Sequence, residues 1–334
     1  MMMTNRERVI AAINFQKTDF VPYDVGFTQQ AHDSVVRAYG ESWFKSFDSH
    51  ITSVDLAKPQ IEVKPAYFRD EYGVVWNKSG ADKDTGMPAE YLITDFESFE
   101  KYDFPLVDES FIRRTCEDLI QIKNDNFKGV MLVFSLFERL WTLMGMEDSM
   151  ANMLLEPELI HSILERICKR NLDILDVALD YDFDFVYFGD DWGQQQGLIM
   201  GVTHWREFVK PYLKQMYSQV KRAGKYIIQH SCGDNREIME DLYELGLNVY
   251  QTFQPEIYGL DYSKKLRGKV AIFGGISTQR DLPAKTPDEI KIITKNTIAH
   301  FKEHGGLIIA PTHAIPGDVP AENIAAMIEV FTNQ

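Results

Sequence analysis

Short apolar runs recur along the chain, and they predict the strands of a parallel sheet. Each run is rich in β-branched or aromatic residues and is apolar at consecutive positions, as is typical of strands covered on both faces. A further, hidden strand is predicted near residues 50–56. The clear runs are residues 21–27, 130–135, 183–188, 226–229, 248–253, 270–273 and 307–310.

Segments with helical periodicity separate these runs. Residues 7–15 are predicted to form a short helix, with Thr4 as its N-cap, that covers one end of the core. The alternation of strands and helices calls for parallel strands with crossover helices, and eight strands favour a closed TIM barrel over an open sheet. We therefore expect an α/β fold in which residues 1–334 form a single (β/α)8 barrel domain. The longer helical segments are residues 155–179, 205–223, 235–245 and 287–304.

Residues 57–127 break this rhythm and are predicted to form an insertion into the barrel. Within them, residues 67–76 have the alternating aromatics and central Asp-Glu-Tyr-Gly of a hairpin, and a loop rich in Gly and Asp follows. Two interpretations are open: the insertion only covers one barrel end, or it forms a lid over a substrate. In the second case Tyr72 and Trp76 are candidates for contacts with an aromatic substrate, although the same side chains would serve as the core of the lid.

The composition excludes several classes of function. The chain carries 35 Lys and Arg against 50 Asp and Glu, and the resulting formal charge of -15 repels nucleic acid and acidic membrane surfaces. Its three cysteines are an odd number at wide spacings, which favours a reducing cytoplasm over a secreted disulfide scaffold. The longest strongly apolar stretch, residues 130–137, is far too short to span a membrane. We expect a soluble cytoplasmic protein that binds a small molecule.

Polar residues and glycines follow five consecutive predicted strands. In a parallel barrel the chemistry lies where the strands end and the βα loops begin, so these clusters are candidates for a site. Asp190 and Asp191 face opposite ways on an extended strand, so one of them is expected to point into the barrel mouth. A carboxylate there serves as a general acid or base or as a ligand, or it caps the following segment. We assign Asp191 to catalysis, and we assign substrate contacts to Asp190, Gln254, Gly274 and Gly275.

His230 and Cys232 are two residues apart at a strand end, so their side chains point to the same side. Imidazole and thiolate together suit zinc, which in catalytic sites takes three protein ligands and keeps one position open. The candidates for the third ligand are His313, Asp191, Asp190 and Glu138. The alternative is that Cys232 is a small buried residue and His230 a hydrogen-bonding histidine, because a single His-x-Cys is a weak signal.

In several segments the sequence resembles the uroporphyrinogen decarboxylase superfamily. The resemblance implies a (β/α)8 barrel, and the superfamily includes both the decarboxylase and corrinoid-dependent methyltransferases. In the family's order the matching segments are MTNRERVIAAINFQKTDFVPYD, FRDEYGVVW, SLFERLWTLMGME, GDDWGQQQG, HSCGDNREIMEDLYELGLNVYQTFQPE, FGGISTQ and PTHAIPGDVPAENI.

The decarboxylases and the methyltransferases of this superfamily differ in two sequence features that can be compared with this chain. The decarboxylase carries an arginine-containing segment after its first strand to hold substrate carboxylates, and residues 22–30 contain no arginine. The methyltransferases resemble this chain in the His-x-Cys that binds zinc. Their distant third ligand is a cysteine, and the position before Glu322 and Asn323 that corresponds to it is His313. The resemblance therefore implies zinc at His230, Cys232 and His313.

The resemblance to the methyltransferases also implies partners. The D-x-H-x-x-G corrinoid signature is absent, since Ser53 stands where the glycine is needed, so a separate protein would carry the corrinoid. The leading hypothesis is a zinc-assisted methyltransferase with a small substrate such as a methoxylated aromatic, with Asp191, Glu138 and His230 as catalytic residues. Many barrels of this family pair as dimers, so the resemblance is compatible with a homodimer and leaves the oligomeric state open. The alternatives are a metal-free decarboxylase of a small acidic substrate and a barrel that binds a ligand without chemistry.

Overall fold

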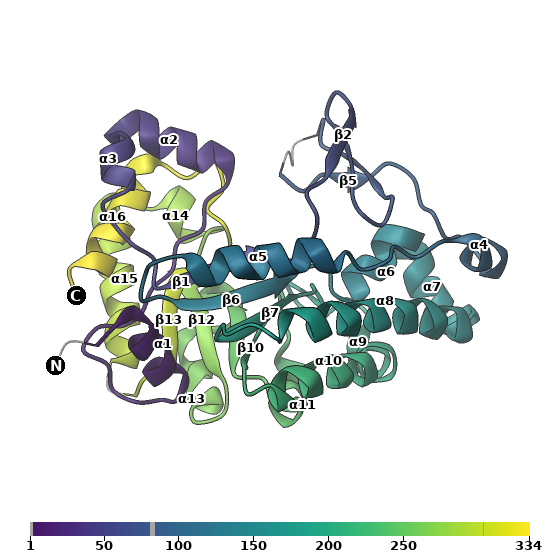
Figure 1. The fold of residues 1–334 in the computed structure, drawn as a ribbon. Coiled ribbons are helices and arrows are strands. Elements are labelled where there is room, and N and C mark those ends of the chain that lie inside the picture. Colours follow the sequence, from purple (N-terminus) through teal and green to yellow (C-terminus); the bar gives the residue numbers. More distant parts are fainter. Residues whose placement is uncertain (1–2, 81–83, 303) are drawn as a thin grey trace.

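A parallel sheet of seven strands curls into the barrel at the centre of the protein (Figure 1). The computed structural model describes residues 3–80, 84–302 and 304–334. All neighbouring strands in this sheet run parallel, and helices surround them, as the sequence predicts. In spatial order the strands are β1 (Ile51–Asp55), β6 (Phe127–Leu132), β7 (Phe185–Gly189), β10 (Tyr226–His230), β11 (Val249–Phe253), β12 (Ala271–Ile276) and β13 (Leu307–Pro311).

The segment around Tyr23 fills the gap between the first and last strands. On one side, Asp24 donates its backbone N–H to the Ile309 carbonyl, and Ile309 donates to Pro22. On the other side, the backbone N–H of His50 donates to the Tyr23 carbonyl. The hidden strand near residues 50–56 is confirmed as β1, whereas residues 21–27 form only isolated bridges, at Tyr23 and at Phe27. Pro22 has no N–H to give to a ladder, which keeps this pairing short.

Helices connect the strands and cover the outside of the barrel. The helix predicted at residues 155–179 is confirmed at residues 157–178, and it begins at Pro157 because proline is favoured in the first turn of a helix. Leu155 ends the preceding helix. The helices are α1 (Asn5–Ile13), α2 (Gln29–Tyr39), α3 (Glu41–Phe44), α4 (Phe96–Lys101), α5 (Glu109–Gln121), α6 (Phe137–Met144), α7 (Met146–Leu155), α8 (Pro157–Ala178), α9 (Gly201–His204), α10 (Lys210–Arg222), α11 (Met239–Leu245), α12 (Pro255–Tyr258), α13 (Ser263–Leu266), α14 (Asp281–Ala284), α15 (Pro287–Phe301) and α16 (Ala321–Thr332), with the π-helix η1 (Trp205–Val209) and the 3-10 turns η2 (Arg236–Ile238) and η3 (Leu260–Tyr262).

The barrel interior is filled by its own apolar core, which α1 closes at the end where the strands begin. The Phe127 and Phe185 rings stack with their centroids 4.9 Å apart, and Val9 and Ile13 of α1 belong to the same buried cluster. Thr4 caps α1 in a reciprocal capping box, which confirms the predicted N-cap. The helix begins and ends two residues before the predicted bounds. The N-terminal end of the barrel is therefore packed, so the opposite end is left for a site.

Between β1 and α5 the chain leaves the barrel and forms a small antiparallel sheet, visible above α6 in Figure 1. The predicted hairpin is confirmed: β3 and β4 pair with Phe68 opposite Trp76. Asp70 fixes the turn because it accepts backbone N–H groups from Tyr72 and Val74, and it forms a buried ion pair with Arg139 at 2.7 Å. Part of the predicted Gly- and Asp-rich loop lies outside the described residues. The strands of this sheet are β2 (Ile61–Lys64), β3 (Tyr67–Arg69), β4 (Val75–Asn77) and β5 (Met87–Pro88), and a further small hairpin is formed by β8 (Gly193–Gln194) and β9 (Gly197–Leu198).

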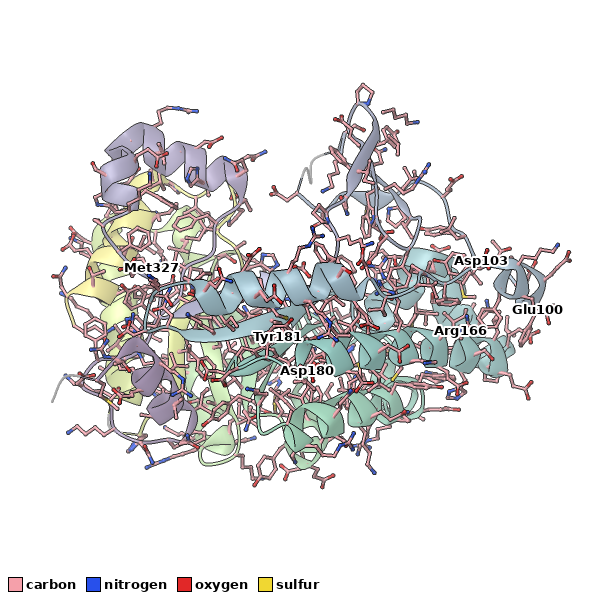
Figure 2. All side chains as sticks on the ribbon, viewed as in Figure 1. Glu100, Asp103, Arg166, Asp180, Tyr181 and Met327 are labelled. Carbon is pink, nitrogen blue, oxygen red and sulfur yellow. The ribbon has the colours of Figure 1, made fainter. Side chains whose placement is uncertain are left out.

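The excursion ends before α5. This helix packs against β1, β6 and α8 and forms the crossover between β1 and β6, so it is part of the barrel although it lies inside residues 57–127. Figure 2 labels Arg166 on α8, whose guanidinium carbon lies 5.0 Å from the centre of the Phe104 ring in the segment that returns from the excursion.

No helix among the described residues is long and apolar enough to cross a membrane.

His50, which bonds to the closing segment at Tyr23, is expected to make the stability of the fold depend on pH. His50 is 4% exposed, and burial lowers its pKa to about 4, below the value of about 6.5 in an unfolded chain. The unfolded state therefore binds a proton first as the pH falls, so stability is present above pH 6.5 and is lost as the pH falls towards 4. We expect a loss of about 2–3 kcal/mol from this group, measured by urea unfolding at several pH values. A His50→Gln variant with the same loss between pH 6.5 and 4.5 would contradict the assignment.

Candidate metal centre and active-site cavity

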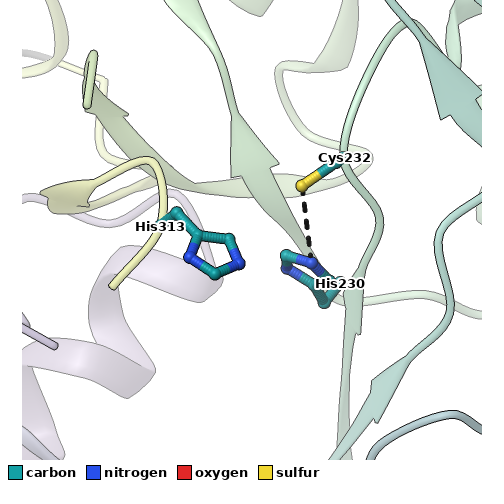
Figure 3. Close-up of side chains that lie close together, drawn as sticks. All are labelled: His230, Cys232 and His313. Carbon is teal, nitrogen blue, oxygen red and sulfur yellow. Dashed lines mark hydrogen bonds between the residues drawn. The ribbon is translucent and has the colours of Figure 1, made fainter. Parts of the chain in front are cut away.

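His230, Cys232 and His313 meet at the end of the barrel where the strands terminate. Their ligand atoms all lie within 4.8 Å of one another. The Cys232 Sγ is 3.7 Å from His230 Nε2, and the rings of His230 and His313 have centroids 5.8 Å apart. Figure 3 shows the His313 ring approaching His230 from a separate loop. β11 and β12 lie between the strands that carry the two histidines, so the side chains meet across the barrel mouth.

The spacing and chemistry of these atoms fit zinc. Tetrahedral bonds of about 2.3 Å to sulfur and about 2.0–2.1 Å to nitrogen place the two ligand atoms about 3.6 Å apart. The observed 3.7 Å between Cys232 Sγ and His230 Nε2 agrees with that value. His230 and Cys232 are partly buried and His313 is exposed, so three protein donors leave a fourth direction for a substrate or water.

Glycines let the loop that carries Cys232 approach its neighbour. A Cβ on Gly233, whose φ is +79°, would lie 2.2 Å from the backbone of Gly193. Because both positions lack a side chain, the two loops touch, and the Asp234 backbone N–H donates to the Gln194 carbonyl. The backbone N–H of Cys232 also donates to Asp191 Oδ1 at 2.7 Å. These contacts fix the backbone that presents the thiol.

A glutamine in the middle of β11 orients His230. Gln251 Oε1 makes a short hydrogen bond with His230 Nδ1, and it also accepts from the Tyr187 hydroxyl at 2.9 Å. An oxygen acceptor at Nδ1 places a proton on that nitrogen, so a neutral imidazole would carry its lone pair on Nε2, which faces Cys232. Burial opposes the charge of His230, but Tyr187, Asp191 and Cys232 raise its pKa well above the ordinary value, so a metal would take the place of the second proton on Nε2. Gln251 therefore fixes the tautomer that a metal requires.

Gln251→Leu is expected to weaken zinc binding about 10–100-fold, because the imidazole loses the acceptor that fixes its tautomer. The measurement is a competition titration of the metal-free protein with a zinc chelator. Tyr187→Phe is the matched control, since it keeps the hydrogen bond between Gln251 and His230, and a smaller effect is expected. Equal zinc affinities for Gln251→Leu and the wild-type protein would show that Gln251 has no such role.

Asp190 and Asp191 point in opposite directions, as predicted, and they have different partners. Asp190 is fully buried and accepts backbone N–H groups from Leu136, Phe137 and Glu138, so it caps the start of α6 from a neighbouring strand. Burial raises its pKa to about 6 despite these bonds. Asp191 Oδ1 instead lies 3.2 Å from His230 Nε2. Burial opposes ionisation of Asp191, but the hydrogen bond and charge of His230 hold its pKa below the usual range.

Glu138 stands in the first turn of α6, next to these carboxylates. Burial, followed by the charges of Asp191 and Asp190, raises the pKa of Glu138 well above its ordinary value. Its side chain accepts a hydrogen bond from the Asp191 backbone. A carboxyl group that holds its proton to a higher pH than usual is suited to act as an acid.

A cavity of about 600 Å³ opens beside the candidate metal centre. Four predicted site residues line it, namely Glu138, Asp191, His230 and His313. The insertion contributes Met87 to the wall, so part of the excursion reaches the site. None of the predicted substrate contacts belongs to the described lining: Asp190, Gln254, Gly274, Gly275, Tyr72 and Trp76.

Those remaining residues have structural partners instead. Gln254 Oε1 accepts the backbone N–H of Gly233, and Gly274, at a φ of +136°, allows Phe253 to approach closely. Tyr72 lies beneath the Arg139 guanidinium, and Trp76 is 1% exposed. These contacts are typical of core and loop support, so a role in direct substrate binding stays a prediction for this group.

The cavity also contains residues that the sequence analysis did not single out. Tyr187 and Gln251 were overlooked because they lie inside strands, yet a polar residue in an otherwise apolar strand was an available signal. Asp24, Phe134 and Trp141 come from the closing segment, the loop after β6 and α6, respectively. Only the closure of the barrel brings these elements together.

The parallel barrel with a polar centre at its strand ends defines the class of (β/α)8 enzyme folds. Residues 85–334 match the family described as Uroporphyrinogen decarboxylase (URO-D), and the chain belongs to that family.

Individual relatives agree with this assignment. A uroporphyrinogen decarboxylase from Thermus thermophilus is 24% identical over 180 residues, which cover 53% of this chain and 49% of that protein. A uroporphyrinogen decarboxylase from Coxiella burnetii is 21% identical over 188 residues, 53% of this chain and 48% of that protein. The matches thus span about half the length of these curated relatives. A methyltransferase from Methanosarcina mazei has the same fold, with a TM-score of 0.69 at 15% identity over 99% of each chain.

Proposed function

We propose that this protein is a zinc-assisted methyltransferase that moves a methyl group between a small substrate in the cavity and a corrinoid carried by a separate partner protein. The observation that carries the proposal is the convergence of His230, Cys232 and His313 beside the cavity from strands that are not neighbours. The shared fold with a methyltransferase supports it.

The donor set determines how a metal would serve this reaction. His230, Cys232 and His313 would hold zinc with one position open towards the cavity, and the bound ion would supply a Lewis acid beside the reacting atoms. Gln251 keeps the His230 ring in the required tautomer. The exposed His313 leaves this side of the centre accessible to a partner that carries the corrinoid.

The residues around the centre position the substrate and move its proton. Glu138, which holds its proton to higher pH than an ordinary carboxyl group, would protonate a leaving oxygen. Asp191 would stay ionised and hold the loop of Cys232 in place through the hydrogen bond of 2.7 Å that it accepts from the Cys232 backbone. Asp190 fixes the first turn of α6 and so the position of Glu138.

The cavity wall disfavours the decarboxylation of a substrate with many carboxylates. None of the described residues that line the cavity is Lys or Arg, whereas Asp24, Glu138 and Asp191 each contribute a carboxyl group. An anionic substrate would lose its hydration without gaining a cationic partner. The absence of arginine from residues 22–30 agrees with this wall.

The test is an assay of methyl transfer from a panel of methylated donors to free cob(I)alamin, which stands in for the partner protein. The absorbance of the cobalamin measures the transfer. We expect transfer by the zinc-loaded protein and at least a hundredfold loss on chelation or in His313→Ala. His304→Ala, which changes an exposed histidine away from the cavity, is the matched control. Release of carbon dioxide from a small acid without corrinoid would support decarboxylation instead. Ligand binding that survives both His230→Ala and His313→Ala, with no turnover of any donor, would support a binding protein.

A further inference from the structure

Two carboxyl groups of the cavity, those of Asp24 and Glu138, have no Lys or Arg partner among the described lining residues, whereas Asp191 lies 3.2 Å from His230 Nε2. Asp24 accepts hydrogen bonds from Ser49 and from the Val25 backbone, and Glu138 accepts one from the Asp191 backbone. In the part of the chain that the structure describes, the cavity lining contains no Lys or Arg. Burial raises the pKa of Asp24 to about 6, so it is ionised above that pH. Partly buried charges of one sign are stabilised by a ligand of the opposite sign.

A bound zinc ion would not reverse this charge. Zn²⁺ adds two positive charges, whereas the Cys232 thiolate, Asp24, Glu138 and Asp191 contribute one negative charge each, which leaves a net charge of about -2. If Glu138 keeps its proton, the balance is about -1. The cavity stays negative in both cases, so it attracts a cation and repels an anion.

Aromatic rings form the apolar part of the same wall. Phe134 and Trp141 have ring centroids 6.5 Å apart and planes at 67°, so they make a corner. Phe134 has a φ of +52°, a conformation that is unfavourable for a bulky residue and that recurs at functional sites. Trp141 lies one helical turn after Glu138 on α6, which places the indole and the carboxyl group on the same face of the helix.

We propose that the methylated substrate of this site is a cation, a quaternary ammonium compound, held between the aromatic corner of Phe134 and Trp141 and the carboxylate of Asp24. Aromatic faces together with negative charge are the chemistry that recognises methylated ammonium groups. The inference rests on the proposed methyl transfer and replaces the methoxylated aromatic as the expected donor.

Methyl transfer from such a substrate would need no proton donor. The methyl group would pass to the Co(I) of a corrinoid on the partner, and the electron pair of the broken C–N bond would stay on nitrogen. The product would be a neutral tertiary amine, which the carboxylate of Asp24 no longer attracts. Asp24 would therefore serve both binding of the substrate and release of the product.

The test compares choline with 3,3-dimethyl-1-butanol, its neutral isostere, by calorimetric titration of the zinc-loaded protein. We expect choline to bind at least tenfold more tightly. Asp24→Asn and Trp141→Leu should each weaken choline binding by about 3–30-fold and change binding of the isostere by less than threefold. Asp180→Asn, which changes an exposed surface carboxylate, is the control and should change neither. Equal binding of the two compounds, or preferred binding of 3-methoxybenzoate, would overturn the proposal.

Binding is measured without corrinoid, so failure of this inference is distinguishable from failure of the proposed function. A protein that binds choline selectively and transfers no methyl group would refute methyl transfer and leave the cation site standing. A protein that demethylates methoxybenzene but does not discriminate choline from its isostere would refute the cation site alone. Circular dichroism of each variant excludes loss of folding as the cause of weaker binding.

Discussion

Cys232→Ser is expected to lower the zinc affinity by orders of magnitude while changing the melting temperature little. The thiolate is a soft anionic donor, and the serine hydroxyl that replaces it stays protonated near pH 7. The substitution is nearly isosteric and lies after the end of β10, outside the barrel interior. Zinc stoichiometry and thermal unfolding, measured on the same preparation, give both quantities.

The opposite pair of results would contradict the ligand assignment. If Cys232 is only a small buried residue, serine should cost about 1–3 kcal/mol through an unsatisfied hydroxyl and leave the metal content unchanged. A variant that keeps its zinc and melts several degrees lower would therefore exclude the thiolate as a ligand. Cys168→Ser is the matched control, since Cys168 is buried in α8 and is not part of the candidate centre. It should lose stability and keep its zinc.

Asp190→Ala is expected to destabilise the protein by about 3 kcal/mol or more, because three buried backbone donors lose their acceptor. These donors are the N–H groups of Leu136, Phe137 and Glu138, and the indole of Trp192 loses its bond to Asp190 as well. α6 has no side-chain cap of its own. Urea unfolding followed by tryptophan fluorescence and by circular dichroism measures the loss.

Asp190→Asn separates the hydrogen bonds from the charge. The amide keeps one oxygen acceptor and turns the other position into a donor that opposes the N–H groups of α6, so its cost should lie between zero and that of alanine. Asp180→Asn, on an exposed side chain, should change stability by less than about 0.5 kcal/mol. A stable Asp190→Ala protein would show that water replaces the carboxylate at the start of α6.

Most of the barrel could be predicted because its strands are apolar on both faces, which gives a strong local signal. The ends of elements were less predictable. The helix predicted from residue 155 begins at Pro157, and Pro22 keeps the closing segment to isolated bridges. α5 lies within the residues predicted as the insertion, and only its packing on β1 and β6 shows that it is a helix of the barrel.

Part of the candidate centre could be predicted from strand ends, because parallel strands bring their last residues to one edge. This rule predicts His230 and Cys232 and leaves four candidates for the third ligand, from which the family resemblance selects His313; the structure brings His313 to the other two although two strands lie between them. The position of a residue at a strand end does not show whether its side chain already has hydrogen-bond partners in the protein. The Asp190 carboxylate accepts four hydrogen bonds, and Gln254 accepts one from Gly233, so neither side chain lines the cavity. Such pairings depend on loop conformations that the periodicity of a sequence does not encode.

Zinc-edge X-ray absorption spectroscopy of the wild-type protein, together with its metal content, tests the central claim most directly. We predict about one zinc per chain, with one sulfur ligand at about 2.3 Å and nitrogen or oxygen ligands at about 2.0–2.1 Å. Cys232 would supply the sulfur, and His230 and His313 two of the nitrogens. Less than about 0.2 zinc per chain after expression with added metal, or a bound zinc without sulfur in its coordination shell, would contradict the account.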